Sequence, residues 1–278
     1  MQLAVDLVSV PSPTGDEQAM GERVREELED MGLQVQWQEV EDGRPNVVGL
    51  WEGSGGGKSL MFNGHMDTSY SGREPWLAGI RGFQPQGFVQ EGRVYGLGIS
   101  NMKGALACYM EAVRALRDAG VRLRGDVMIA CVAGEIEKTQ WHPDFVGSEY
   151  RGYASGSRFL TSHGAVTDMC VLGEPTEQKI VLGHYGSLWL RISTSGPFIH
   201  TAGNFREHEE VFGEKPERDT VRWFSDASTL TRYGIDSVNY GTSSGLPDPE
   251  LGENLDIDGL VKIATVYTGV AQRICEVG

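Results

Sequence analysis

The sequence lacks the features of a secreted scaffold, a membrane span or a nucleic-acid surface. It has only 4 cysteines in 278 residues and no Cys-x-x-Cys pair, which argues against a disulfide framework and a zinc knuckle. No apolar run is long enough to cross a bilayer, and no basic-then-apolar signal pattern opens the chain. The net charge of −15 argues against non-specific nucleic-acid binding, which depends on cationic side chains. We therefore expect a cytoplasmic protein with no nucleic-acid or membrane partner.

The apolar periodicity predicts an α/β fold. Helical spacing covers 20–31, 105–119 and 260–274, and buried or half-buried strands are predicted at 33–37, 46–51, 60–62, 127–133, 169–172, 180–182 and 188–192. Thr14-Gly15-Asp16-Glu17 has the form of a capping box before the first long helix. Asp256 or Asp258 is expected to cap the last helix. This order of elements predicts a mixed sheet flanked by helices.

Three of the predicted strands end in the same way. The strand at 60–62 leads into His65 and Asp67, and the next two buried strands each end in glycine followed by glutamate, at Glu135 (with Glu137 close behind) and Glu174. Ligands bind at the carboxyl ends of strands in open α/β sheets. A solvated loop carboxylate is the ordinary interpretation of any one glutamate. Three acidic or imidazole groups at equivalent strand ends favour a metal site, in which a carboxylate beside histidine fixes the tautomer of the ring.

Three segments together resemble the zinc aminoacylase family, which includes acetylornithine deacetylase, succinyl-diaminopimelate desuccinylase and carboxypeptidase G-type peptidases. The segments are Gly64-His65-Met66-Asp67-Thr68, Asn101-Met102-Lys103-Gly104 (after Tyr95-Gly96-Leu97-Gly98) and Gly173-Glu174-Pro175-Thr176. The match runs from about residue 8 to 200 and resumes from about 220. The resemblance implies two Zn²⁺ ions, or the related Mn²⁺ or Co²⁺, and a homodimer where the family's small lid domain is present.

The resemblance also implies a role for each matched residue. His65 and Glu174 would bind one ion, and Asp67 would orient His65. Asn101 takes the place of an aspartate that bridges both ions. The remaining roles are a general base at Glu135, a second-ion ligand at Glu137, and a lid histidine at His200 that holds the oxyanion of the reaction.

The sequence departs from the family pattern at the second ion. Asn101 is a neutral amide, either through natural divergence or through a substitution that traps an inactive form, and cannot neutralise two dications. Ile136 splits the acidic pair, so either Glu135 is the base and the ligand is lost, or Glu137 is the ligand and the base is lost. No histidine follows His208, although one is expected near 245–253, where Asp248, Glu250 or Glu253 could substitute. We therefore expect one ion rather than two.

The lid is also shortened in this sequence. We predict a catalytic α/β domain at 1–179 and 219–278, with 180–218 as the remnant of a lid or dimerisation domain whose missing part is either deleted or disordered. The expected function is metal-dependent hydrolysis of an amide, or displacement of an amine, in a small N-acylated or amine-bearing acid. The alternatives are an aromatic amine hydrolase with one metal ion, and a non-catalytic binding member that has lost its second metal site.

Overall fold

The computed structural model describes residues 1–136, 150, 152–181, 226, 229–230, 233–239 and 251–275, with the backbone alone at 236–239 and 273. The chain divides into one unit of Met1–Gly183 with Ser225–Gly278 and a second of His184–Phe224. All the described residues belong to the first unit. The predicted lid remnant lies outside them except at 180–181, and so does the predicted strand at 188–192. The proposed domain boundaries therefore stay a prediction.

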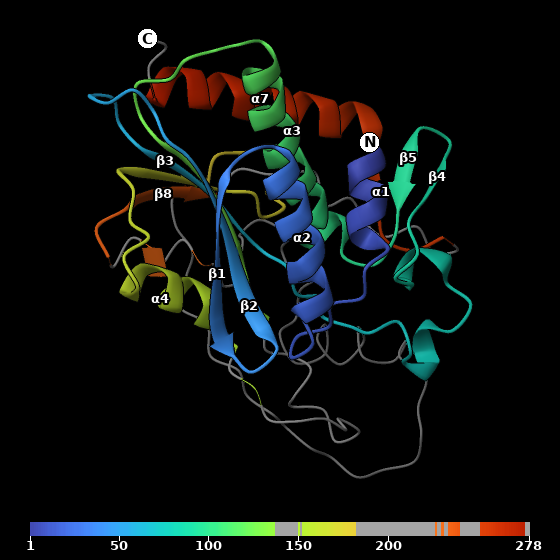
Figure 1. Cartoon of the computed structure of the whole chain (residues 1–278). Coiled ribbons are helices and arrows are strands. Elements are labelled where there is room, and N and C mark those ends of the chain that lie inside the picture. The colour runs from blue at the N-terminus through green and yellow to red at the C-terminus, as the bar shows by residue number, and fades with distance from the viewer. Residues whose placement is uncertain are drawn as a thin grey trace, which may run out of the picture. The chain divides into compact units, whose positions relative to one another are not determined.

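A mixed sheet forms the centre of the first unit, as the sequence predicts (Figure 1). Within the described residues its strand order is β1-β2-β6-β3-β7-β8. Strands β6, β3, β7 and β8 run parallel, whereas β1 and β2 form an antiparallel hairpin and β2 pairs antiparallel with β6. The strands are β1 (Gln34–Glu41), β2 (Arg44–Trp51), β3 (Leu60–His65), β6 (Val127–Val132), β7 (Met169–Leu172) and β8 (Asp236–Asn239).

A smaller antiparallel sheet joins distant parts of the chain. It contains β4 (Phe88–Gln90), β5 (Arg93–Tyr95) and β9 (Asn254–Asp256) in that order. Two short 3₁₀ turns, η1 (Pro75–Leu77) and η2 (Arg81–Phe83), precede it. The pairing of β5 with β9 brings residues near 254 beside the loop that leads to Asn101.

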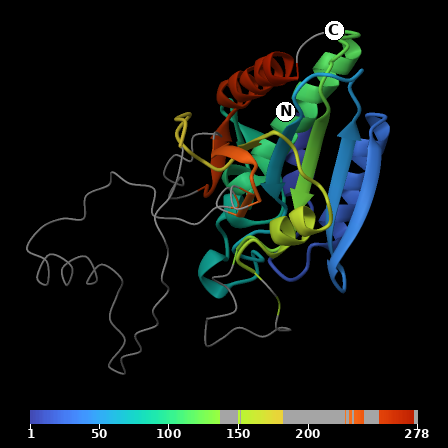
Figure 2. The same cartoon turned by 90° about the vertical axis from the view of Figure 1, so that its left-hand side faces the viewer.

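Helices cover both faces of the main sheet because its strands are apolar on both sides. Residues of α1 (Gln2–Val8), α2 (Gln18–Asp30), α3 (Gly104–Asp118) and α7 (Ile257–Ile274) share one core with Leu60 and Phe62 of β3. Met61 points to the opposite face, into a second core with Leu160 of α4 (Ser155–Ser162). Helix α7 packs against α3 (Figure 1, Figure 2). No helix in the described part of the chain is both long and apolar enough for a membrane span.

The structure confirms one predicted helix cap and corrects another. Gly32 follows α2 with φ of 71°, the left-handed conformation that favours glycine after a helix. The side chain of Asp256 caps α7 by accepting from the backbone N–H of Gly259. The predicted capping box is wrong: α2 begins at Gln18, and its N-cap residue, Glu17, makes no side-chain capping bond. Both capping-box side chains instead have buried partners elsewhere in the fold.

Candidate metal and catalytic site

The site lies where three parallel strands end. Strands β6, β3 and β7 are adjacent, so their carboxyl ends meet at one edge of the sheet. His65 is the last residue of β3, and Glu135 and Glu174 follow β6 and β7 within three residues. The Nε2 atom of His65 lies 3.6 Å from Glu174 Oε1 and 3.9 Å from Glu135 Oε2. The three predicted strand-end residues therefore come together, with one ligand atom from each inside a 4.8 Å span.

The hydrogen bonding of His65 directs one ring nitrogen into the site. Nδ1 lies 2.9 Å from the backbone oxygen of Asp67. A carbonyl oxygen only accepts, so Nδ1 carries the proton in the neutral ring and Nε2 keeps a lone pair. Nε2 faces the amide oxygen of Asn101 at 2.9 Å as well as the carboxylate of Glu174. A cation suits such a set of acceptors.

Buried acidic groups dominate the electrostatics of the site. Burial alone would lower the pKa of His65, but hydrogen bonding to Asp67 and the charges of Glu174, Asp67 and Glu135 raise it well above its ordinary value. Burial and the nearby carboxylates of Glu174, Asp226 and Asp67 raise the pKa of Glu135 well above its ordinary value, against the opposing effect of His65. The site therefore favours the binding of positive charge.

Asp67 holds the chain around the site through its carboxylate. Its Oδ1 accepts from the backbone N–H of Glu135 at 3.1 Å, and its Oδ2 accepts from Ile136 N–H at 2.9 Å and from the Thr14 hydroxyl at 2.8 Å. Burial would raise the pKa of Asp67, but its bonds to His65, Ile136 and Thr14 outweigh burial and hold the pKa below its usual value. The carboxylate lies 3.5 Å from His65 Nδ1, farther than the backbone oxygen that fixes the ring.

Asn101 reaches the site from the turn η3 (Ile99–Lys103), which leads into α3. Glu253 anchors this turn by accepting from the backbone N–H groups of Gly98, Ser100 and Asn101 and from the Ser100 hydroxyl. Glu253 is one of the three residues suggested as substitute ligands. Its carboxylate instead accepts hydrogen bonds from the turn that carries Asn101. The buried amine of Lys103 donates to Val10 O at 2.6 Å, and burial lowers its pKa to about 7.

Two predicted site residues, Glu137 and His200, lie outside the described residues, as do Asp248 and Glu250. The structure adds two residues that the sequence pattern does not assign to the site. The spacing of Thr14 predicts a helix cap, but its hydroxyl donates to Asp67. Asp226 is fully buried, accepts from the Ser157 hydroxyl, and has its pKa raised by burial to about 6. Asp226 stands in no motif that pattern or spacing would have revealed.

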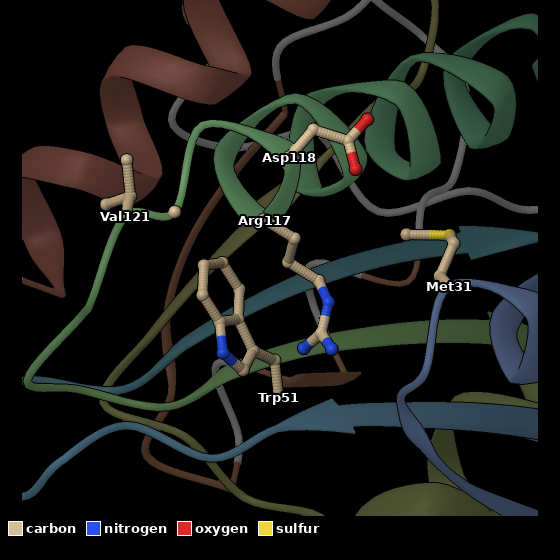
Figure 3. A pocket seen from close by; sticks show the side chains of 6 residues that line it. Met31, Trp51, Arg117, Asp118 and Val121 are labelled. Atoms are coloured by element: carbon tan, nitrogen blue, oxygen red, sulfur yellow. The ribbon is translucent and has the colours of Figure 1, made fainter.

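A separate surface pocket lies at the other end of the sheet. It is lined by Met31, Trp51, Arg117, Asp118, Gly120 and Val121, and the Arg117 guanidinium lies 5.4 Å from the Trp51 ring (Figure 3). Trp51 pairs with the first residue of β6, whereas His65 pairs with the last. Five residues of a strand span roughly 16 Å, so this pocket is not part of the candidate site.

An imidazole and two carboxylates thus converge at the strand ends of a mixed α/β sheet, a donor set that fits the divalent cation of a metal-dependent hydrolase. Residues 61–273 match the profile of Peptidase family M20/M25/M40. The chain belongs to this family. The predicted resemblance to deacylating relatives is confirmed.

The names of the relatives indicate different substrates. The chain is 30% identical to a succinyl-diaminopimelate desuccinylase of Gluconacetobacter diazotrophicus over 87% of its length and 63% of the relative's. It is 29% identical to an acetylornithine deacetylase of Aliivibrio fischeri over 63% of this chain and 40% of that one. A tripeptidase structure from Staphylococcus aureus has the same fold, with a TM-score of 0.69 at 14% identity, covering 99% of this chain and 97% of that chain.

The chain spans about three fifths of the length of the first curated relatives it matches, 63% and 62%. The family and the catalytic-domain fold follow from these comparisons. The activity, substrate and assembly of the whole protein are proposals.

Proposed function

We propose that the protein hydrolyses an amide bond of a small N-acylated amino acid with the help of one divalent cation. The observation that carries this proposal is the convergence of the His65 Nε2 lone pair with the carboxylates of Glu174 and Glu135 at one buried strand edge. One imidazole and carboxylate oxygens, with a position left open, are typical of a catalytic zinc site. Zinc fits this donor set, as do Mn²⁺ and Co²⁺.

The residues divide the work by their positions. His65 and Glu174, which make the shorter of the two contacts, would hold the ion, and Asn101 would add an amide oxygen. When bound, the cation polarises the substrate carbonyl and lowers the pKa of a water molecule. A single ion suits this set because the amide of Asn101 supplies no charge to a second one. The candidate second-ion ligand Glu137 belongs to the part of the chain that is not described.

Glu135 is the general base in this proposal. Its carboxylate takes a proton from water as the water oxygen bonds to the carbonyl carbon of the amide. The carbon–nitrogen bond then breaks, and Glu135 returns the proton to the departing amine, so that a carboxylic acid and an amine are released. Burial and the neighbouring carboxylates raise the pKa of Glu135, against the opposing effect of His65. A bound cation would lower this pKa again and keep the carboxylate ionised, as a proton acceptor must be.

The test separates the base from the metal ligands. Glu135→Gln should abolish turnover of N-acyl amino acids and leave about one equivalent of bound metal, whereas His65→Ala and Glu174→Gln should lose the metal. Glu111→Gln, on the exposed face of α3, is the control that should keep both. Survival of activity in Glu135→Gln would transfer the role of base to Glu137 and overturn the present assignment.

The amide at Asn101 supports a second candidate, a non-catalytic member that keeps the fold. Metal analysis after supplementation distinguishes the two. A protein that binds no ion would be the non-catalytic member. One bound ion per chain supports the mononuclear hydrolase, and two bound ions support the ordinary family centre. Asn101→Asp should raise the metal stoichiometry only if the remaining second-site ligands are present.

The names of the relatives guide the choice of substrates. A panel of N-succinyl, N-acetyl and N-formyl compounds corresponds to the desuccinylase, deacetylase and deformylase that the chain resembles. Aromatic amines belong in the same panel, because displacement of a ring amine by water uses the same groups. We also propose that the protein is cytoplasmic, and that it forms a homodimer if a lid domain is present. Sedimentation of the full chain tests the dimer.

A further inference from the structure

We infer that Thr14 is a positioning residue for the general base, acting through the carboxylate of Asp67. This inference rests on the proposed function for its catalytic consequence but on geometry alone for its structural one. Thr14 lies in the segment between α1 and α2 and touches neither a candidate metal ligand nor the carboxylate of Glu135 in the described contacts. Its influence on the site passes through one hydrogen-bond acceptor.

The hydroxyl of Thr14 lies on a buried segment that backbone hydrogen bonds hold in place. Residues 12–14 run alongside 66–68: Thr68 N–H donates to Ser12 O at 2.8 Å, and Thr14 N–H donates to Thr68 O at 3.2 Å. Thr14 is 6% exposed. Its Oγ1 lies 2.8 Å from Asp67 Oδ2 and 3.3 Å from Thr68 O, and the shorter contact takes its only proton.

The Asp67 carboxylate links this segment to the base. Its two oxygens accept from the backbone N–H groups of Glu135 and Ile136, while Oδ2 also accepts from Thr14. Rotation of the carboxylate would therefore move the backbone from which the Glu135 side chain departs. The Thr14 hydroxyl is a side-chain donor that opposes this rotation, so its loss leaves the two backbone amides and the more distant His65 ring, at 3.5 Å, to hold a fully buried charge.

Three variants separate positioning from simple loss of a buried hydroxyl. Thr14→Val removes the donor at nearly constant volume, and Thr14→Ser keeps it. Thr161→Val is the matched control, because Thr161 is 5% exposed and its hydroxyl bonds to the carbonyls of Ser157 and Arg158 within α4.

The first measurement is hydrogen exchange of the Glu135 and Ile136 backbone amides. We expect exchange roughly tenfold faster in Thr14→Val than in Thr161→Val or the unmodified protein, because a hydrogen bond to a charged group is lost. The second is steady-state hydrolysis with metal content measured in parallel. We expect kcat to fall roughly tenfold with KM and metal content unchanged, and Thr14→Ser to restore it.

The two measurements can refute the proposed function and the positioning role independently of each other. If the unmodified protein hydrolyses no amide but Thr14→Val speeds exchange at 135–136, the proposed function is wrong and the positioning role stands. If Thr14→Val matches Thr161→Val in exchange, or Thr14→Ser behaves like Thr14→Val, the positioning role is overturned even when the enzyme is active.

Discussion

Replacing Arg44 by methionine should destabilise the protein severely, because it would leave the carboxylate of Glu17 buried without its cation. Arg44 is 3% exposed and Glu17 is fully buried. The guanidinium donates to both carboxylate oxygens, from Nε at 2.8 Å and from Nη2 at 2.7 Å. Arg44 also bonds to Glu41 and lies 5.1 Å from the Tyr150 ring.

The magnitude follows from the burial of the two partners. Removing one partner of a buried pair costs about 3–5 kcal/mol, because an uncompensated charge remains. With a slope of about 3 kcal/mol per molar urea, the urea concentration at the unfolding midpoint should fall by about 1 M or more. Glu41→Gln is the matched control, since it removes only the partly exposed partner of the same guanidinium; exposed pairs contribute about 0–1 kcal/mol.

The pH dependence gives a second signature. Burial already raises the pKa of Glu17 above its ordinary value, and loss of the guanidinium would raise it further. As the pH falls, the native Arg44→Met protein then binds a proton that the unfolded chain does not yet bind, so its deficit in stability should narrow between pH 7 and 5. The double variant Glu17→Gln/Arg44→Met should be less destabilised than the sum of its singles. An Arg44→Met midpoint equal to that of Glu41→Gln would refute the reasoning.

Two further predictions concern the packing and the thiols. In Gly173→Ala the new Cβ would lie 2.4 Å from Tyr109 Oη and 2.6 Å from Ala105 Cβ, so we expect a loss of about 1–3 kcal/mol in thermal unfolding, against no loss for Gly269→Ala, where the space is open. Burial raises the pKa of Cys131 to about 12. Above pH ~9 the unfolded chain therefore releases a thiol proton that the native chain keeps. The unfolding free energy should fall more steeply with pH between 9 and 11 than in Cys131→Ala, and parallel curves would contradict the burial argument.

The strand-end site was predictable because it depends on two local sequence features: apolar runs of strand length, and the polar residues that directly follow them. Apolar runs of strand length identified the parallel strands of β3, β6 and β7, and residues placed just after such strands must meet at one edge of the sheet. His65, Glu135 and Glu174 were therefore predictable as neighbours. The resemblance added Asn101, whose oxygen the structure places against His65.

What the sequence could not predict are contacts that have no fixed spacing. Thr14 and Glu17 have the spacing of a capping box, and local pattern alone favours that interpretation. Their actual partners, Asp67 and Arg44, lie 53 and 27 residues away. Such pairings depend on how the segments pack. Asp226 escaped for the same reason, because a single buried aspartate has no sequence signature.

Four of the buried carboxylates of the site fall into two groups, and this division explains how the site is built. Asp67 and Glu253 accept mainly from backbone N–H groups, so their charge is satisfied by the folded chain and fixes the loops on which the ligands sit. Glu135 and Glu174 instead converge on His65 Nε2. The negative charge of the second group is what a bound cation would compensate. Substitutions in the first group should therefore act on the geometry of the site, and substitutions in the second on its occupancy and chemistry.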